Sequence, residues 1–288
     1  MKISDIYSKK GNRSVSFEIF PPKGDLDVAT VKGLVGDLAS LGPDYISVTY
    51  SAGGGGNSKN TLAVTSAVKE AGVESMAHLT CINSSREEIY DLMGQLKARG
   101  IENVFALRGD IAENGALSKD FSYASDLIPV LKENGFCVGA ACYPEGHVQC
   151  ESVEKDIYFL KKKQDAGADF FLSQLFFDNE RFFRFLESAQ KAGITVPISA
   201  GIMPLLGKSQ ISRMIFMCGA SLPSDIIRIL NRYENSPDDL RRAGIEYAAR
   251  QISEILDHGG ASVHLYTMNH PDIAGSILSY IRDLGYEL

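Results

Sequence analysis

A carboxylate at the end of an apolar strand pattern is the side chain of this sequence with the clearest capacity for chemistry. Glu18 lies in the stretch 15–20, where apolar and other side chains alternate, and Pro21 and Pro22 follow. The alternation predicts a β-strand, which the prolines end because proline cannot donate to a ladder. A carboxylate among apolar and aromatic side chains is costly to bury unless it is paired, hydrogen-bonded or protonated. We therefore expect the fold to place Glu18 at a working site.

Further polar side chains stand at the C-terminal ends of other predicted strands. They are Thr49, Tyr50, His78, Thr80, Arg108, Asp110, Tyr143, Glu145, His147, Gln174, Tyr266 and Asn269. Arg108 supplies a planar donor fork for phosphate or a flavin edge, Gly109 allows close backbone approach, and Asp110 can accept from ligand N–H groups. A surface turn with an Arg–Asp pair is the alternative for this tetrapeptide. The N-terminal strand ends carry no matching set, which favours an enzyme.

The elements that must position these residues alternate regularly along the chain. Strands are expected at 15–20, 45–50, 75–81, 103–107, 136–143, 169–175, 197–202 and 262–267. Helices are expected at 27–41, 60–71, 86–99, 123–134, 152–166, 179–192, 206–217, 223–233, 237–257 and 271–284. Eight strand–helix repeats favour a closed parallel (β/α)8 TIM barrel of the α/β class, whose working groups lie at the C-terminal strand ends. We expect a single catalytic domain over 1–288.

Composition excludes several classes of protein. The 288 residues are 44% hydrophobic and 23% charged with a net charge of −7, which is ordinary for a globular protein and argues against a nucleic-acid partner. No apolar run approaches the ~18 residues of a membrane span, and the polar start is not a signal peptide, so we expect a cytoplasmic protein. The five cysteines and five histidines lack metal-site spacings, so we expect idle thiols and no metal.

Three features of the sequence each have two possible interpretations. His78 is either a barrel-interior histidine or a site residue. The run Lys161–Lys163 is either a solvated helix end or a diphosphate-binding group. The glycine-rich stretch 51–61 is a near miss to a phosphate-binding P-loop, because Ser58 and Asn60 stand where that motif needs Gly and Ser or Thr. We expect this stretch to form a loop over the rim of the barrel, and we do not expect a nucleoside triphosphatase.

Ten ordered segments carry a family resemblance that runs over about 14–280, nearly the whole chain. They are Ser16–Pro22, Ser47–Tyr50, Ala77–Cys81, Ala106–Asp110, Tyr123–Leu127, Ala141–His147, Asp165–Asp169, Gln174–Asp178, Gly201–Pro204 and Tyr266–Asn269. On these segments the chain resembles methylenetetrahydrofolate reductase, in the short bacterial form without a regulatory domain.

The resemblance implies a flavin-dependent reduction of 5,10-methylenetetrahydrofolate to 5-methyltetrahydrofolate. The cofactor would be FAD, with FMN as the alternative, and a reduced nicotinamide would load it by ping-pong hydride transfer. Glu18 would be the general acid that protonates folate N10, a task for a carboxyl group whose pKa an apolar setting raises. The resemblance leaves open NADH, NADPH or ferredoxin as donor, and a role in methionine biosynthesis or carbon fixation. It implies a homo-oligomer or a complex with an electron-transfer subunit.

The resemblance also assigns roles to single residues. Asp110 would hold the pterin and tune the flavin, while Thr49 would lie beside flavin and nicotinamide. Folate would meet Gln174, Gln210, Tyr266 and the position of His270. Positions that match flavin contacts are Tyr50, Ala52, His78, Arg108, Gly109, Ala124, Tyr143, His147, Asp156, Lys162 and Lys163.

Four positions depart from the family pattern. Phe159 replaces an expected Asn and Lys162 an expected Arg, which could weaken binding of the adenine half of FAD. Met214 replaces an aromatic that holds the nicotinamide dinucleotide, and His270 replaces an Arg that contacts folate. Two alternatives therefore stay open. In one, an iron–sulfur partner or ferredoxin reduces the flavin. In the other, the barrel binds flavin or folate without turnover.

Overall fold

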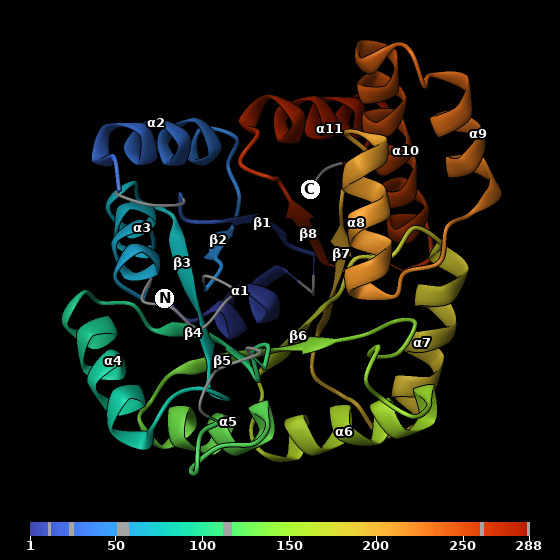
Figure 1. Cartoon of the computed structure of the whole chain (residues 1–288). Coiled ribbons are helices and arrows are strands. Elements are labelled where there is room, and N and C mark those ends of the chain that lie inside the picture. The colour runs from blue at the N-terminus through green and yellow to red at the C-terminus, as the bar shows by residue number, and fades with distance from the viewer. Residues whose placement is uncertain (11–12, 23–25, 51–57, 112–116, 260–261, 287–288) are drawn as a thin grey trace.

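Eight parallel strands close into a barrel in a computed structural model of the chain (Figure 1). The structure describes residues 1–288 except 11–12, 23–25, 51–57, 112–116, 260–261 and 287–288. Each strand pairs with the next along the chain, and β1 closes the ring by pairing with both β2 and β8. The prediction of a (β/α)8 TIM barrel is confirmed.

The observed elements follow the predicted alternation, with most strands shorter by one to three residues. The strands are β1 Val15–Ile19, β2 Tyr45–Val48, β3 Glu74–Thr80, β4 Asn103–Leu107, β5 Cys137–Cys142, β6 Phe170–Ser173, β7 Ile198–Ile202 and β8 Ser262–Tyr266. The helices are α1 Ile3–Lys10, α2 Val28–Ala39, α3 Ser58–Glu70, α4 Arg86–Ala98, α5 Ala124–Glu133, α6 Val153–Asp165, α7 Asn179–Lys191, α8 Lys208–Cys218, α9 Ser224–Arg232, α10 Pro237–Asp257 and α11 Pro271–Asp283.

The alternation of β1 sets its two faces as the sequence predicts. Val15, Phe17 and Ile19 join the large apolar cluster between the barrel and its helices. Ser16 and Glu18 point to the interior, where Ser16 contacts His264 of β8 and Glu18 lines a cavity. A one-residue shift would reverse both sets, so burial of the apolar face fixes the register that places Glu18 inside.

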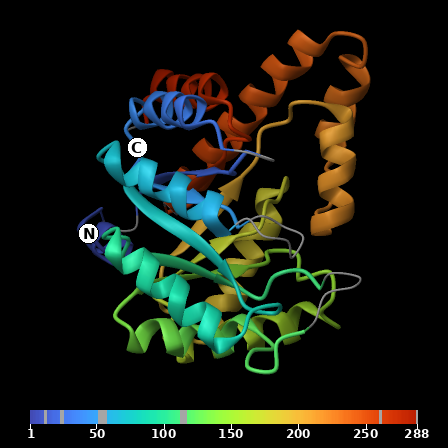
Figure 2. The same cartoon turned by 60° about the vertical axis from the view of Figure 1, so that its left-hand side comes forward.

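Helix α1 was not predicted, because the first thirteen residues read as a polar stretch. It lies at the N-terminal end of the barrel (Figure 2). There Ile3, Ile6 and Tyr7 pack against interior side chains that include Tyr45 and Phe170. The three buried residues follow helical spacing on one face, as expected for a helix that seals an apolar opening. Helix α1 thus closes the N-terminal end of the barrel, and the C-terminal end is open.

Helices α8 and α9 stand outside the regular ring. Figure 2 shows α8 beyond the C-terminal ends of the strands, on the side opposite α1. Glu145, which follows β5, accepts hydrogen bonds from the backbone N–H and the hydroxyl of Ser221 between these helices. Glu145 therefore ties the two helices to the barrel. Of the helices in the described residues, none has the length and apolarity to cross a membrane.

Candidate active site

A cavity of about 940 Å³ opens at the C-terminal end of the barrel. This volume is near the upper end of the ~300–1,000 Å³ of small-molecule and cofactor sites. Among its lining residues are twelve that the sequence singled out: Glu18, Thr49, Tyr50, His78, Thr80, Arg108, Gly109, Asp110, Tyr143, His147, Gln174 and Tyr266. Strand ends far apart in the sequence thus meet around one space.

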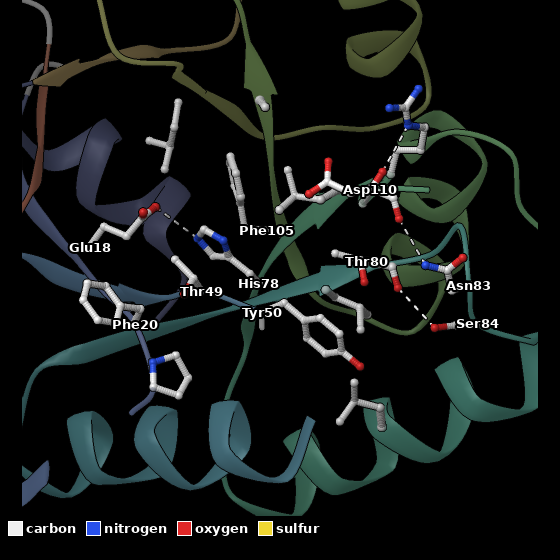
Figure 3. Close-up of a pocket in the computed structure, with 18 of the residues that line it drawn as sticks. Glu18, Phe20, Thr49, Tyr50, His78, Thr80, Asn83, Ser84, Phe105 and Asp110 are labelled. Atoms are coloured by element: carbon white, nitrogen blue, oxygen red, sulfur yellow. Dashed lines mark hydrogen bonds and ion pairs between the residues drawn. The ribbon is translucent and has the colours of Figure 1, made fainter. Parts of the chain in front are cut away.

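Glu18 lies between two histidines on the wall of this cavity. Its Oε2 atom is 3.6 Å from Nε2 of His78 on β3 and 3.6 Å from Nε2 of His264 on β8. The side chain is 20% exposed, so it reaches the cavity while most of its surface is covered. Figure 3 shows Glu18 and His78 pointing toward one another, with Thr49 close by.

His78 combines the two interpretations that the sequence left open. It is buried in the barrel interior with its ring 4.8 Å from that of Phe105, yet it lines the cavity. Its Nε2 atom is buried without a hydrogen-bond partner among the described residues. Burial lowers the pKa of His78 to about 4, and the nearby Glu18 carboxylate opposes this only in part. His78 is therefore a neutral imidazole at neutral pH.

His264 is a site residue that the sequence reasoning missed. It is fully buried, with Nδ1 2.7 Å from the Ser16 hydroxyl and Nε2 3.3 Å from the Ser47 hydroxyl. The signal was present, because His264 shares the inward face of β8 with Tyr266. His264 lies two positions before Tyr266, the last residue of β8, and so falls outside the set of strand-end residues.

The turn after β4 is shaped by close packing against β3. Gly109 has φ of +87°, and a Cβ there would lie 2.8 Å from Cβ of Thr80, so the turn requires glycine. Arg108 donates from Nη2 to Oε1 of Gln149 at 2.7 Å and from Nε to the Gly109 carbonyl at 3.2 Å. Arg108 and Asp110 do not form the surface ion pair that was the alternative interpretation. Both side chains line the cavity.

A partly buried lysine lies behind the cavity wall. Lys163 donates from Nζ to the Ala141 carbonyl at 2.8 Å, and the same atom lies 5.4 Å from the ring centroid of Tyr143. Burial lowers the pKa of Lys163, and burial raises the pKa of the neighbouring Asp156. These groups support Tyr143, and His147 packs edge-on against that ring at 4.7 Å.

The lysine run 161–163 divides among three environments. Lys161 pairs with Asp165 on the same helix, and Lys163 is the partly buried lysine beside Tyr143. Lys162 Nζ lies 4.8 Å from the ring centroid of Tyr158 and 5.8 Å from that of Phe159. Phe159 in turn stacks on Tyr123 with centroids 6.4 Å apart. Phe159 and Lys162 are the two positions on α6 that depart from the family pattern. They thus lie in an aromatic surface that one ammonium group covers.

Tyr266 is held across the mouth by two strands. Its hydroxyl donates to the Ser173 carbonyl at 2.7 Å, and burial raises its pKa well above the ordinary value. A Cβ on Gly201 would lie 2.3 Å from the same carbonyl oxygen and 2.8 Å from the Tyr266 ring, so only glycine fits there. Asn269 exchanges hydrogen bonds with the backbone of Phe20 at 3.0 and 2.9 Å, which fixes the chain beyond Glu18.

The remaining predicted residues lie away from the cavity lining. Ala124 begins α5, Asp156, Lys162 and Lys163 lie on α6, Gln210 lies on α8, and His270 precedes α11. The Gln210 amide accepts from the Leu206 N–H at 2.8 Å, and the His270 side chain is half exposed. Ala52 falls outside the described residues, as does most of the glycine-rich stretch. Arg213 on α8 and Phe105 on β4 line the cavity and were not foreseen.

The chain is similar to known proteins over most of its length. The family profile described as methylenetetrahydrofolate reductase matches residues 2–282. A 5,10-methylenetetrahydrofolate reductase of Pectobacterium carotovorum is 33% identical over 269 residues, which cover 93% of this chain and 90% of that protein. Methylenetetrahydrofolate reductase (NADH) 1 of Arabidopsis thaliana is 33% identical, with 96% of this chain matching 49% of that protein.

A solved structure shares the fold at low sequence identity. A protein from Clostridium thermocellum, described as binding two copies of 5-methyl-5,6,7,8-tetrahydrofolic acid, superposes with a TM-score of 0.65 at 15% identity. The match covers 97% of this chain and 99% of that one. At this identity the likeness concerns the barrel fold. Within the described part of the chain, no three acidic, histidine or cysteine side chains gather as a metal site.

Proposed function

This chain belongs to the methylenetetrahydrofolate reductase family, and we propose that it reduces 5,10-methylenetetrahydrofolate to 5-methyltetrahydrofolate with a bound flavin, Glu18 acting as the general acid. The observation that supports this most is the position of Glu18. Its carboxyl group is mostly covered, lies between two imidazoles, and still reaches the large cavity at the open end of the barrel.

The residues around the cavity fit a flavin. Arg108 presents a planar fork beside the Gly109 turn, and Asp110 provides a carboxylate on the same wall. The unsatisfied Nε2 atom of His78 gives a buried polar group that lacks a partner within the described chain. A bound flavin would supply the hydride that reduces the one-carbon bridge of the folate. Arg108, Gly109, Asp110, Thr49 and His78 are the residues that would hold its ring system.

Glu18 would supply the proton that this reaction needs. Donation of a proton to N10 lets the bond between N10 and the bridge carbon break, with the electron pair staying on N10. The bridge remains on N5 as a cationic group that accepts hydride. A positioned acid of this kind contributes roughly 10²–10⁴-fold to rate. Limited exposure of Glu18 supports the role, because water would otherwise compete for the proton.

Folate would be held on the wall next to Glu18. The Gln174 Oε1 atom accepts from the Leu175 N–H at 2.9 Å, which orients the amide and leaves its NH₂ group as the donor for a ligand. Asp110 would accept from the N–H groups of the pterin ring. Tyr266, fixed by the Ser173 carbonyl, would border the same space. Gln210 and His270 would meet the part of the substrate that extends beyond the cavity, since neither lines it.

The flavin would be FAD, with FMN as the alternative that the aromatic surface of Phe159 and Lys162 leaves open. The electron donor would be NADH or NADPH in ping-pong order, or else ferredoxin or an iron–sulfur partner subunit. Mass spectrometry of the released cofactor decides the first question. Stopped-flow bleaching of the flavin by NADH decides the second, because a partner-fed enzyme would bleach slowly or not at all. A cytoplasmic homo-oligomer or complex, serving methionine biosynthesis or carbon fixation, is part of the same proposal.

The deciding experiment replaces Glu18 with Gln and follows each half-reaction separately. Re-oxidation of the reduced flavin by methylenetetrahydrofolate should slow by about 10²-fold or more, because glutamine cannot donate an acidic proton. Flavin content and its reduction by dithionite should stay as in the parent protein. A control replaces His258, which is exposed on the far side at the end of α10, with Gln. Folate turnover at the parent rate in Glu18→Gln would refute the acid role.

A further inference from the structure

The two histidines that flank Glu18 have different surroundings. Each presents Nε2 to the same carboxylate oxygen at 3.6 Å. The Nε2 atom of His78 has no hydrogen-bond partner among the described residues. His264 instead has a serine hydroxyl at each ring nitrogen, Ser16 at 2.7 Å and Ser47 at 3.3 Å.

This difference decides which ring can carry a positive charge. A protonated imidazole has two N–H donors, and both need acceptors when the ring is buried. The hydroxyl oxygens of Ser16 and Ser47 can accept from His264, which is fully buried, while Glu18 supplies the opposite charge. Among the described residues, the Nε2 atom of His78 faces the Glu18 carboxylate and has no hydrogen-bond partner, and its ring packs on Phe105. His264 is therefore the ring that the surroundings equip to exchange a proton with Glu18.

We propose that Glu18 and His264 share one proton in the resting protein, and that His264 is a positioning residue which keeps this proton beside Glu18. The pair then alternates between an imidazolium with a carboxylate and a neutral imidazole with a carboxylic acid. Both forms are neutral overall, so neither leaves the mostly covered carboxylate as a lone charge. The functional part of this inference rests on the acid role of Glu18 proposed above.

The other titratable groups facing the pair do not compete for this proton. His78 approaches from β3 and stays neutral at neutral pH because burial lowers its pKa. Tyr45 from β2 stacks on His264 at 6.1 Å, and Tyr266 from β8 lies edge-on at 5.5 Å. Burial raises the pKa of both tyrosines well above the ordinary value, so both keep their own protons.

The proton balance of a turnover follows from this arrangement. When the resting proton lies on His264, the Nε2–H bond breaks and an O–H bond forms on Glu18. The carboxyl O–H bond then breaks as the N10–H bond of folate forms, and the pair is left with one negative charge. One proton from solvent restores it. Each turnover therefore takes up one proton, which remains in the product on N10.

The test measures the protonation of His264 in the full chain with its flavin. Histidines labelled with ¹³C give one ring signal each, and the His264 signal is identified by its loss in His264→Gln. If the proton is shared, the His264 signal should titrate at lower pH in Glu18→Gln than in the parent, because the carboxylate that stabilises the imidazolium is then gone. Ser16→Ala, which removes the acceptor at Nδ1, should move it in the same direction. The exposed His258 should titrate identically in all of them.

A kinetic measurement adds a readout that a merely structural role would not move. The rate of flavin re-oxidation by methylenetetrahydrofolate should fall at high pH, and His264→Gln should shift the midpoint of this fall about one unit lower. His258→Gln should leave the midpoint in place. A His264 titration that is the same in the parent and in Glu18→Gln overturns the shared proton, as does an unchanged midpoint in His264→Gln.

The outcomes separate this inference from the proposed function. Loss of folate reduction in Glu18→Gln with no change in the His264 titration supports the acid role and overturns the shared proton. A shifted His264 titration in a chain that reduces no folate supports the shared proton and overturns the proposed function. If His264→Gln does not fold, the Ser16→Ala and Glu18→Gln titrations decide alone, with the His264 signal assigned by exclusion.

Discussion

Acidification should destabilise the barrel through His78, and the structure sets the size of the effect. Burial lowers the pKa of His78 to about 4, against 6.5 for the unperturbed side chain. Above pH 6.5 both the folded and the unfolded chain carry a neutral His78, so this residue adds no pH dependence. As the pH falls below 6.5, the unfolded chain binds a proton at His78 that the folded chain does not, and unfolding becomes easier.

The free energy of unfolding should therefore lose about 1.4 kcal/mol per pH unit from this residue alone. The loss ends near pH 4, where the folded chain also takes the proton, and it amounts to roughly 3 kcal/mol. Carboxylates add their own acid dependence, so the prediction concerns a difference between proteins. His78→Gln keeps most of the side-chain volume and removes the titration, so its stability should fall less steeply between pH 6.5 and pH 4.

The assay is urea unfolding followed by circular dichroism at a series of pH values, on protein freed of any bound flavin. The quantity of interest is the stability of the parent minus that of His78→Gln at each pH. A constant offset reflects the cost of burying the glutamine amide and is expected. His258→Gln serves as the matched control, because its histidine is exposed. A difference between parent and His78→Gln that stays flat from pH 7 to pH 4 would refute a neutral, buried His78.

Two further predictions concern the packing that supports the site. Gly201→Ala should cost about 3 kcal/mol, because its Cβ would meet the Ser173 carbonyl oxygen at 2.3 Å and displace Tyr266. Thermal unfolding measures this, and Gly33→Ala on α2, where a Cβ meets nothing within 4 Å, should not lower stability. Ile3→Ala should lower the free energy of unfolding by about 2–5 kcal/mol, since Ile3 is fully buried where α1 closes the N-terminal end of the barrel. An equal, negligible loss in Ile3→Ala and in the exposed Lys9→Ala would show that α1 does not seal the barrel.

The sequence by itself determined the fold class and the end of the barrel at which the candidate site lies. Period-two alternation at 15–20, followed by prolines, identified the strand that carries Glu18 and the face on which it lies. The repeated succession of strand and helix required parallel pairing, and parallel pairing brings all C-terminal strand ends to one rim. These features are local and periodic, so they can be read without any knowledge of contacts.

The tertiary structure alone decided which side chains touch. His264 stands 246 positions after Glu18 in the chain, and only closure of β8 against β1 brings their side chains to 3.6 Å. Strand pairing also places a serine hydroxyl at each ring nitrogen of His264, while the Nε2 atom of His78 has no hydrogen-bond partner in the described part of the chain. Helix α1 was invisible for a similar reason, because its three apolar residues have meaning only against the opening that they fill. Burial and partner identity depend on segments distant in sequence, and periodicity within one segment does not encode them.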